Sequence, residues 1–176
     1  MKKRIIALGL LWCLSAVMLQ AARVDTVLVR SAAMNKDVKV VYVLPDKAIG
    51  KQACPVVYLL HGYGGNARSW VQLKPELPQM ADEKGIIFVC PDGKNSWYWD
   101  SPENPAYRYE TFVTSELVKY TDGNYATIPD SKARAISGLS MGGHGALWSA
   151  IRHKDVFGAA GSMSGGVDIR PFPQNW

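Results

Sequence analysis

Histidine and cysteine are scarce in this sequence, which has three of each among 176 residues. The histidines His61, His144 and His153 and the cysteines Cys54 and Cys90 show none of the spacings typical of metal ligands. The sequence therefore gives no basis for a metal cluster, and no motif implies a cofactor. Repeats and low-complexity segments are also missing, and 48% of the residues are hydrophobic, which indicates one globular domain with a sizeable core.

A strong excess of charge is missing as well. The formal net charge is +5, but Lys2, Lys3 and Arg4 lie in an N-terminal segment with the layout of a secretory signal peptide. Removing these three of the 20 basic residues leaves 17 against 15 acidic ones, a net charge near +2. A charge this small argues against a nucleic-acid partner.

The N-terminal segment continues with an apolar run over residues 5–19 and small residues at Ala21 and Ala22. Fifteen apolar residues are few for a membrane span. We therefore expect residues 1–21 to be a cleaved signal peptide, residues 22–176 to form the exported domain, and the product to be periplasmic or secreted without stable membrane association. An uncleaved segment acting as a membrane anchor is the alternative.

Alternating and continuous apolar segments predict the fold class. Residues 24–31 and 36–45 alternate, which favours an antiparallel hairpin. Segments 55–60 and 85–90 are continuous apolar runs typical of strands buried on both faces, and 133–137 and 156–165 are predicted as two further strands. Three segments have the apolar spacing of a helix. The first covers residues 75–84. The second has one apolar face, Tyr109, Phe112, Val113, Leu117 and Tyr120, and the third has the stripe Ala146, Leu147, Ala150 and Ile151. Strands alternating with helices predict a mostly parallel α/β sheet with flanking helices.

The two cysteines after the signal segment lie at strand ends. Cys54 precedes the strand 55–60 and Cys90 ends the strand 85–90, so parallel pairing separates them by roughly 15 Å at about 3.3 Å per residue. We expect two unpaired, buried thiols.

The stretch ISGLSMGGHGAL, residues 136–147, contains G-x-S-x-G around Ser140. A predicted strand precedes it and a predicted helix follows, which is the context of a nucleophile elbow. Larger side chains than those of Gly138 and Gly142 would collide in such a turn. The amide of Met141, at the helix start, is the expected first donor to an oxyanion. The alternative is a glycine-rich loop that contains a serine by chance.

A second glycine-rich turn, His61-Gly62-Tyr63-Gly64-Gly65, follows the strand 55–60. Backbone N–H groups of such a turn are free to face a substrate oxygen, and Tyr63 is the expected second donor. A phosphate-binding loop is the alternative, but Asn66-Ala67-Arg68 follows in place of the Lys-Ser/Thr of nucleotide loops.

These motifs resemble the esterase D branch of the α/β-hydrolase fold, which includes tributyrin esterases, S-formylglutathione hydrolases, and acetyl and feruloyl esterases. The resemblance covers nearly all of residues 36–166 and is carried by YLLHGYGGNARSW (58–70), PDGKNSWYWDSP (91–102), YETFVTSELVKYTDGNY (109–125), RAISGLSMGGHGAL (134–147) and HKDVFGAAGSMSG (153–165). It implies Ser140 as nucleophile, Met141 and Tyr63 at the oxyanion hole, and Trp97 and Tyr98 near the substrate mouth.

The resemblance also implies an acid and a histidine that follow the nucleophile along the chain. His61 precedes Ser140, His144 shares a helical face with packing residues, and His153 is expected at the exposed end of that helix. Asp168 follows the strand next to the elbow, one strand too early for the family's acid. We therefore expect the triad acid and base to be absent from this chain, which then corresponds to the N-terminal two-thirds of such an esterase.

The predicted function is an exported serine esterase that forms an acyl-enzyme at Ser140 and acts on acetyl or feruloyl carbohydrate esters or on short-chain esters. The 176 residues alone are expected to be nearly inactive. A non-catalytic carbohydrate-binding relic of the scaffold is the alternative.

Overall fold

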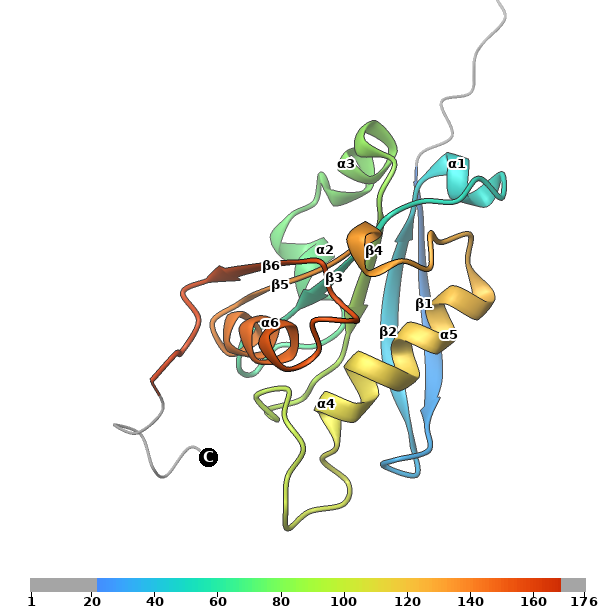
Figure 1. Cartoon of the computed structure of the whole chain (residues 1–176). Coiled ribbons are helices and arrows are strands. Elements are labelled where there is room, and N and C mark those ends of the chain that lie inside the picture. Colours follow the sequence, from blue (N-terminus) through green and yellow to red (C-terminus); the bar gives the residue numbers. More distant parts are fainter. Residues whose placement is uncertain (1–21, 169–176) are drawn as a thin grey trace, which may run out of the picture.

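The computed structural model describes residues 22–168, which form one six-stranded sheet between helices (Figure 1). The strand order is β1-β2-β4-β3-β5-β6. β2 pairs antiparallel with β1 and β4, and the other pairs are parallel. The predicted hairpin and the predicted parallel sheet are both confirmed. The strands are β1 (Arg23–Ser31), β2 (Lys36–Leu44), β3 (Val56–Leu60), β4 (Ile87–Pro91), β5 (Arg134–Leu139) and β6 (Ala159–Met163).

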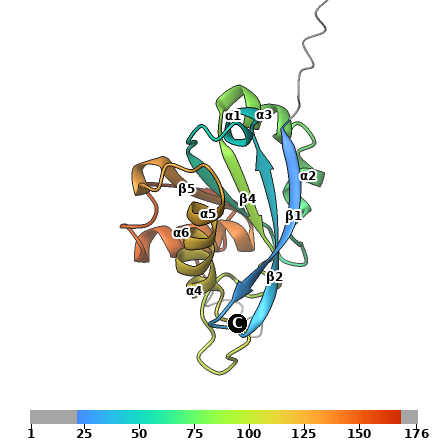
Figure 2. The same ribbon diagram turned by 90° about the vertical axis from the view of Figure 1, so that its right-hand side faces the viewer.

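Helices cover both faces of the sheet, with α5 and α6 on one side and α2 on the other (Figure 2). One segment, predicted as a plain helix from Tyr109 onward, contains a π-helical turn, η1. The helices are α1 (Asp46–Ile49), α2 (Ser69–Leu73), α3 (Leu77–Lys84), α4 (Tyr109–Thr111), η1 (Phe112–Glu116), α5 (Leu117–Asn124), the 3₁₀ turn η2 (Ser131–Ala133) and α6 (Met141–Arg152).

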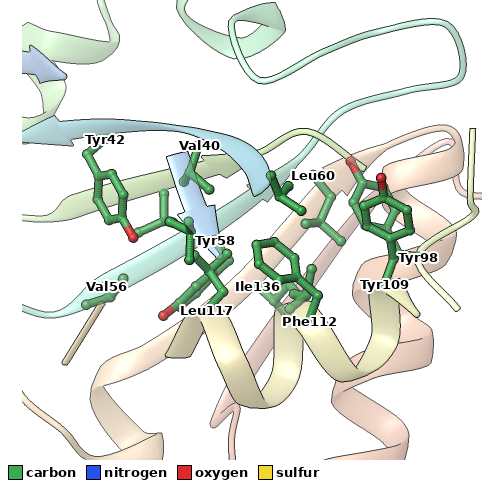
Figure 3. Close-up of a cluster of buried hydrophobic side chains, with 14 of the residues drawn as sticks. Val40, Tyr42, Val56, Tyr58, Leu60, Tyr98, Tyr109, Phe112, Leu117 and Ile136 are labelled. Carbon is green, nitrogen blue, oxygen red and sulfur yellow. The ribbon is translucent and has the colours of Figure 1, made fainter. Parts of the chain in front are cut away.

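The core consists of two clusters, one on each face of the sheet. Alternate residues of β2 enter opposite clusters: Tyr42 packs toward α5, whereas Val41 and Val43 pack toward α2 and α3. This is the period-two alternation of a strand buried on both faces. The cluster on the α5 side holds the large side chains Tyr42, Tyr58, Leu60, Tyr98, Tyr109, Phe112, Leu117 and Ile136 (Figure 3).

The buried face of α6 differs from the predicted stripe. Ala146 is buried as expected, but Ile151 is 66% exposed, and apart from Met141 the other buried positions are glycines and Ser149. Small residues let the helix lie close to the sheet. The predicted stripe is therefore correct for Ala146 and for Ala150, which packs against the core, and wrong for Ile151.

Cys54 and Cys90 are both unpaired and buried, as predicted. Burial raises the pKa of the Cys90 thiol to about 12, so this sulfur stays protonated and unreactive. The proposed signal peptide, residues 1–21, lies outside the described residues. Within residues 22–168, no helix has both the length and the apolar character needed to cross a membrane.

Candidate active site

Ser140 lies on the sharp turn between β5 and α6, with φ 54° and ψ −117°. This backbone conformation is strained for a non-glycine residue. The turn is tight because Gly138 and Gly142 touch: a Cβ at Gly138 would lie 2.2 Å from the Gly142 carbonyl. A Cβ at Gly142 would lie 2.2 Å from the carbonyl oxygen of Leu60, at the end of β3. The elbow therefore accepts only glycine at these two positions, as the motif predicts.

The glycine-rich loop 61–65, which is predicted to supply an oxyanion donor and is called the oxyanion loop below, lies beside the elbow. A Cβ at Gly62 would be 3.6 Å from Cβ of Ser140, so the two turns are in contact. The Gly65 amide donates to Gly62 O at 3.0 Å. The Ser140 amide donates to Met163 O at 2.8 Å and cannot serve an oxyanion at the same time.

Two amides beside the serine remain available. Among the hydrogen bonds of residues 22–168, none uses the backbone N–H of Tyr63 or of Met141. Met141 is the first residue of α6, where N–H groups have no partner inside the helix. These are the two donors that the motifs predicted for the oxyanion hole.

His61 is 2% exposed and is held at both ring nitrogens. Nδ1 donates to Gly62 O at 2.7 Å, and Nε2 accepts the Gly93 amide at 2.9 Å. These partners define a neutral imidazole with its proton on Nδ1. His61 is therefore a structural part of the oxyanion loop and has no nitrogen left to act as a base.

Asp92 lies next to this histidine and is 6% exposed. Burial alone would raise the pKa of its carboxyl group, but hydrogen bonds outweigh burial and hold the pKa well below its usual range. Lys94 supplies them from its amide at 3.0 Å and from Nζ at 2.8 Å. His61 Nε2 is 3.7 Å from the carboxylate and already accepts a hydrogen bond from the Gly93 amide, so we attribute the low pKa to Lys94.

Trp97 and Tyr98, the two aromatic residues predicted at the substrate mouth, lie in different environments. The Trp97 ring is half-buried, 6.5 Å from the exposed ring of Tyr63 and 5.6 Å from that of His144. Tyr98 is fully buried, and its hydroxyl accepts the His61 amide at 3.0 Å. This placement differs from the prediction: Tyr98 faces the core and contacts the oxyanion loop from behind. Consecutive residues with positive φ, 54° and 62°, turn these neighbours in different directions.

The other two histidines are also engaged away from the serine. His144 Nδ1 donates to Gly166 O at 2.8 Å, and its ring stacks on Trp148 at 6.1 Å. His144 is a packing residue of α6, as expected from its helical face. His153 was expected at an exposed helix end, but its Nε2 lies 2.8 Å from Oε1 of Glu110.

Glu110 is the centre of a polar cluster that sequence reasoning missed. Its carboxylate is 8% exposed and accepts hydrogen bonds from Trp148 at 2.7 Å and from Arg152 at 2.7 Å, in addition to His153. Burial alone would raise the pKa of Glu110, but these bonds lower it below its usual value. The partners lie 38 or more positions apart in the sequence, so no local pattern marks them.

A hollow of about 760 Å³ lies beside this cluster and is lined by Trp99, Glu110, Trp148 and Arg152, among others. Ser140 does not line it. Both oxygens of Glu110 are already bonded, and neither the elbow nor the Tyr63 and Met141 amides line the hollow. Chemistry, rather than cavity size, therefore places the candidate active site at Ser140. Among residues 22–168 no group of His, Cys, Asp and Glu could hold a metal ion.

The elbow, the glycine-rich loop and the sheet together have the arrangement of an α/β-hydrolase fold, with Ser140 at the position of the nucleophile elbow. The chain belongs to the esterase family described as "Putative esterase", whose sequence model matches residues 31–176. This membership confirms the resemblance to esterase D-like α/β hydrolases.

Known relatives agree with this family. The chain is 29% identical to an acetyl esterase of Caldicellulosiruptor saccharolyticus, over 72% of this chain and 50% of the relative. It is 34% identical to the diacylglycerol acyltransferase/mycolyltransferase Ag85A of Mycobacterium gordonae, over 82% and 43%. A solved ferulic acid esterase superposes with a TM-score of 0.72 at 31% identity, covering 83% of this chain and 59% of that one. The chain thus spans about half the length of these curated relatives.

Proposed function

We propose that the protein is a serine carboxylic-ester hydrolase that works through an acyl-enzyme at Ser140. The observation that carries this proposal is the position of Ser140 on a strained elbow, beside two backbone amides, of Tyr63 and Met141, that no hydrogen bond of the described residues uses. Such paired donors stabilise the charge that develops on a carbonyl oxygen during acyl transfer.

In the proposed reaction, Oγ of Ser140 bonds to the ester carbonyl carbon and its proton passes to a base. The carbonyl oxygen becomes an oxyanion that accepts from the Tyr63 and Met141 amides. The tetrahedral intermediate expels the alcohol, which takes the proton from the base, and an acyl-enzyme remains. Water then attacks the acyl group by the same route and releases the acid and free Ser140.

We propose that the base comes from outside these 176 residues. The chain has three histidines, and His61, His144 and His153 bond to Gly62 and Gly93, to Gly166 and to Glu110 respectively. Loss of a triad member costs an esterase several orders of magnitude in kcat. The 176-residue chain alone is therefore expected to hydrolyse esters far more slowly than a protein with a complete triad.

For the substrate, we propose acyl esters of carbohydrates, acetyl or feruloyl, with other short-chain esters as weaker substrates. The exposed ring of Tyr63 and the half-buried ring of Trp97 offer flat apolar surface next to the elbow, suited to a sugar or an aromatic acyl group. The similarity to an acetyl esterase and a ferulic acid esterase favours the same class. Export through residues 1–21 to the periplasm or the exterior belongs to this proposal.

Acyl transfer to an alcohol is the second candidate. It uses the same acyl-enzyme, with an acceptor hydroxyl in place of water, and the similarity to a mycolyltransferase favours it. Partition of product between free acid and new ester, measured in the presence of a sugar alcohol, separates the two.

The test is turnover by the complete protein of p-nitrophenyl acetate and of acetylated and feruloylated xylo-oligosaccharides. We expect hydrolysis that Ser140→Ala lowers by at least about 10⁴-fold in kcat. Binding of the oligosaccharides without Ser140-dependent turnover would instead support a non-catalytic binding protein. Hydrolysis that survives Ser140→Ala would contradict the proposal.

A further inference from the structure

Residues 91–106 hold the oxyanion loop at three points. The Gly93 amide donates to His61 Nε2 at 2.9 Å, the Asn95 side chain accepts the Gly64 amide at 2.8 Å, and the Tyr98 hydroxyl accepts the His61 amide at 3.0 Å. The Tyr98 hydroxyl also donates to the His61 carbonyl, at 3.4 Å. The backbone N–H and C=O of His61 are thus both hydrogen-bonded to the Tyr98 side chain.

Tyr98 is itself fixed in place. It is fully buried, and the surrounding backbone leaves it a closely fitting slot. A Cβ at Gly93 would lie 2.2 Å from the Tyr98 ring, and one at Gly145, in α6, would lie 2.6 Å from its Cβ. Its φ of 62° is strained for a tyrosine, so the surrounding packing must stabilise an unfavourable backbone conformation. Because the Tyr98 ring is fixed, its hydroxyl can fix the position of the His61 backbone.

We propose that Tyr98 is a positioning residue for ester hydrolysis: its buried hydroxyl holds the His61 amide and so keeps the oxyanion loop in register with Ser140. This inference rests on the proposed function of Ser140.

The distances along the chain explain why the hydroxyl matters. The proposed donor, the Tyr63 amide, is two residues beyond His61, and Gly62 between them contacts the elbow. An oxyanion donor is effective only within about 2.7–3.1 Å of the developing charge. Displacement of reacting groups by about 1 Å can cost on the order of 100-fold in rate. Loss of the Tyr98 hydroxyl, which frees the His61 amide, therefore weakens the Tyr63 amide as a donor, although Tyr98 does not contact Tyr63.

The variant that tests this is Tyr98→Phe in the complete protein, with Tyr42→Phe as matched control. Each removes one buried hydroxyl: that of Tyr98 bonds the amide and the carbonyl of His61, and that of Tyr42 pairs with Thr121 at 2.9 Å. Tyr42 lies at the opposite end of the same cluster from Tyr98 (Figure 3). Both variants keep the ring, so both are expected to fold and to lose a similar few degrees of thermal midpoint.

For Tyr98→Phe we expect kcat to fall about 10-fold to 100-fold with KM within about threefold of wild type, whereas Tyr42→Phe keeps wild-type kcat. Amide hydrogen exchange over residues 61–66 should quicken in Tyr98→Phe alone. Wild-type kcat and wild-type exchange in Tyr98→Phe would overturn the inference. If wild type shows no Ser140-dependent turnover, the proposed function fails, and the exchange measurement still decides whether Tyr98 positions the loop.

Discussion

The two ends of α6 are held by different kinds of interaction. At the N-terminal end, backbone meets backbone: Gly142 abuts the Leu60 carbonyl, Ser140 is strained, and the first turn has no acidic side chain. At the C-terminal end, the side chains of Trp148, Arg152 and His153 converge on the buried carboxylate of Glu110.

This difference shows how a helix can be anchored firmly while a backbone N–H at its start remains available to bind an oxyanion. Backbone sterics hold the first turn without occupying the Met141 amide, so this N–H stays available for an oxyanion. The Arg152 guanidinium at the last turn suits the negative end of the helix dipole, and its ion pair with Glu110 ties α6 to α4. The N-terminal end of α6 is thus anchored by close backbone packing, and its C-terminal end is anchored by interactions with a charged carboxylate.

The largest effect should come from adding one methyl group at the site end. Gly142→Ala places a Cβ 2.2 Å from a backbone oxygen that has no rotamer to move aside. We expect the free energy of unfolding to fall by about 3 kcal/mol or more, with loss of activity. Urea unfolding of the variant measures the change. Gly123→Ala is the control, because its Cβ would meet nothing within 4 Å, and a gain of up to about 1 kcal/mol is expected there. Equal stability of the two variants would contradict the steric account.

An intermediate effect is expected at the charged end. Glu110→Gln at pH 7 should cost about 1–3 kcal/mol of unfolding free energy, because Trp148, Arg152 and His153 lose a buried, ionised acceptor. Arg152 is 53% exposed, so solvent reduces its share. Glu103→Gln, in an exposed loop, serves as control and should change little.

The cost of Glu110→Gln should also depend on pH. The folded state lowers the pKa of Glu110, so its stabilisation is fully present above the unfolded pKa, about 4.3, and is lost as pH falls through the lower folded pKa. Urea unfolding at pH 7 and at about pH 3 should show the deficit of the variant shrinking in acid. A deficit that grows in acid would have the wrong sign for this account.

The smallest effect is expected on the outer side of α6. Ile151 is 66% exposed, so Ile151→Ala should change the unfolding free energy by less than about 0.5 kcal/mol. A loss above about 1 kcal/mol in the complete protein would show that another surface covers this residue.

The same contrast explains what the sequence could predict. The elbow was predictable because Gly138, Ser140 and Gly142 constrain one another within five residues. The Glu110 cluster was not, since its partners meet only after the chain has folded. The buried face of α6 was misjudged because glycines, which carry no hydrophobic signal, make its closest contacts. Tyr98 was misplaced because positive φ at two successive aromatic residues is set by tertiary packing rather than by local preference.

The account depends most directly on Ser140 as the nucleophile. A fluorophosphonate probe reports this: a serine Oγ attacks phosphorus, displaces fluoride and keeps the phosphonyl group. Peptide mass spectrometry of the treated complete protein should find one phosphonyl group on Ser140 and none in Ser140→Ala. Modification at another residue, or equal modification of the Ser140→Ala variant, would contradict the account.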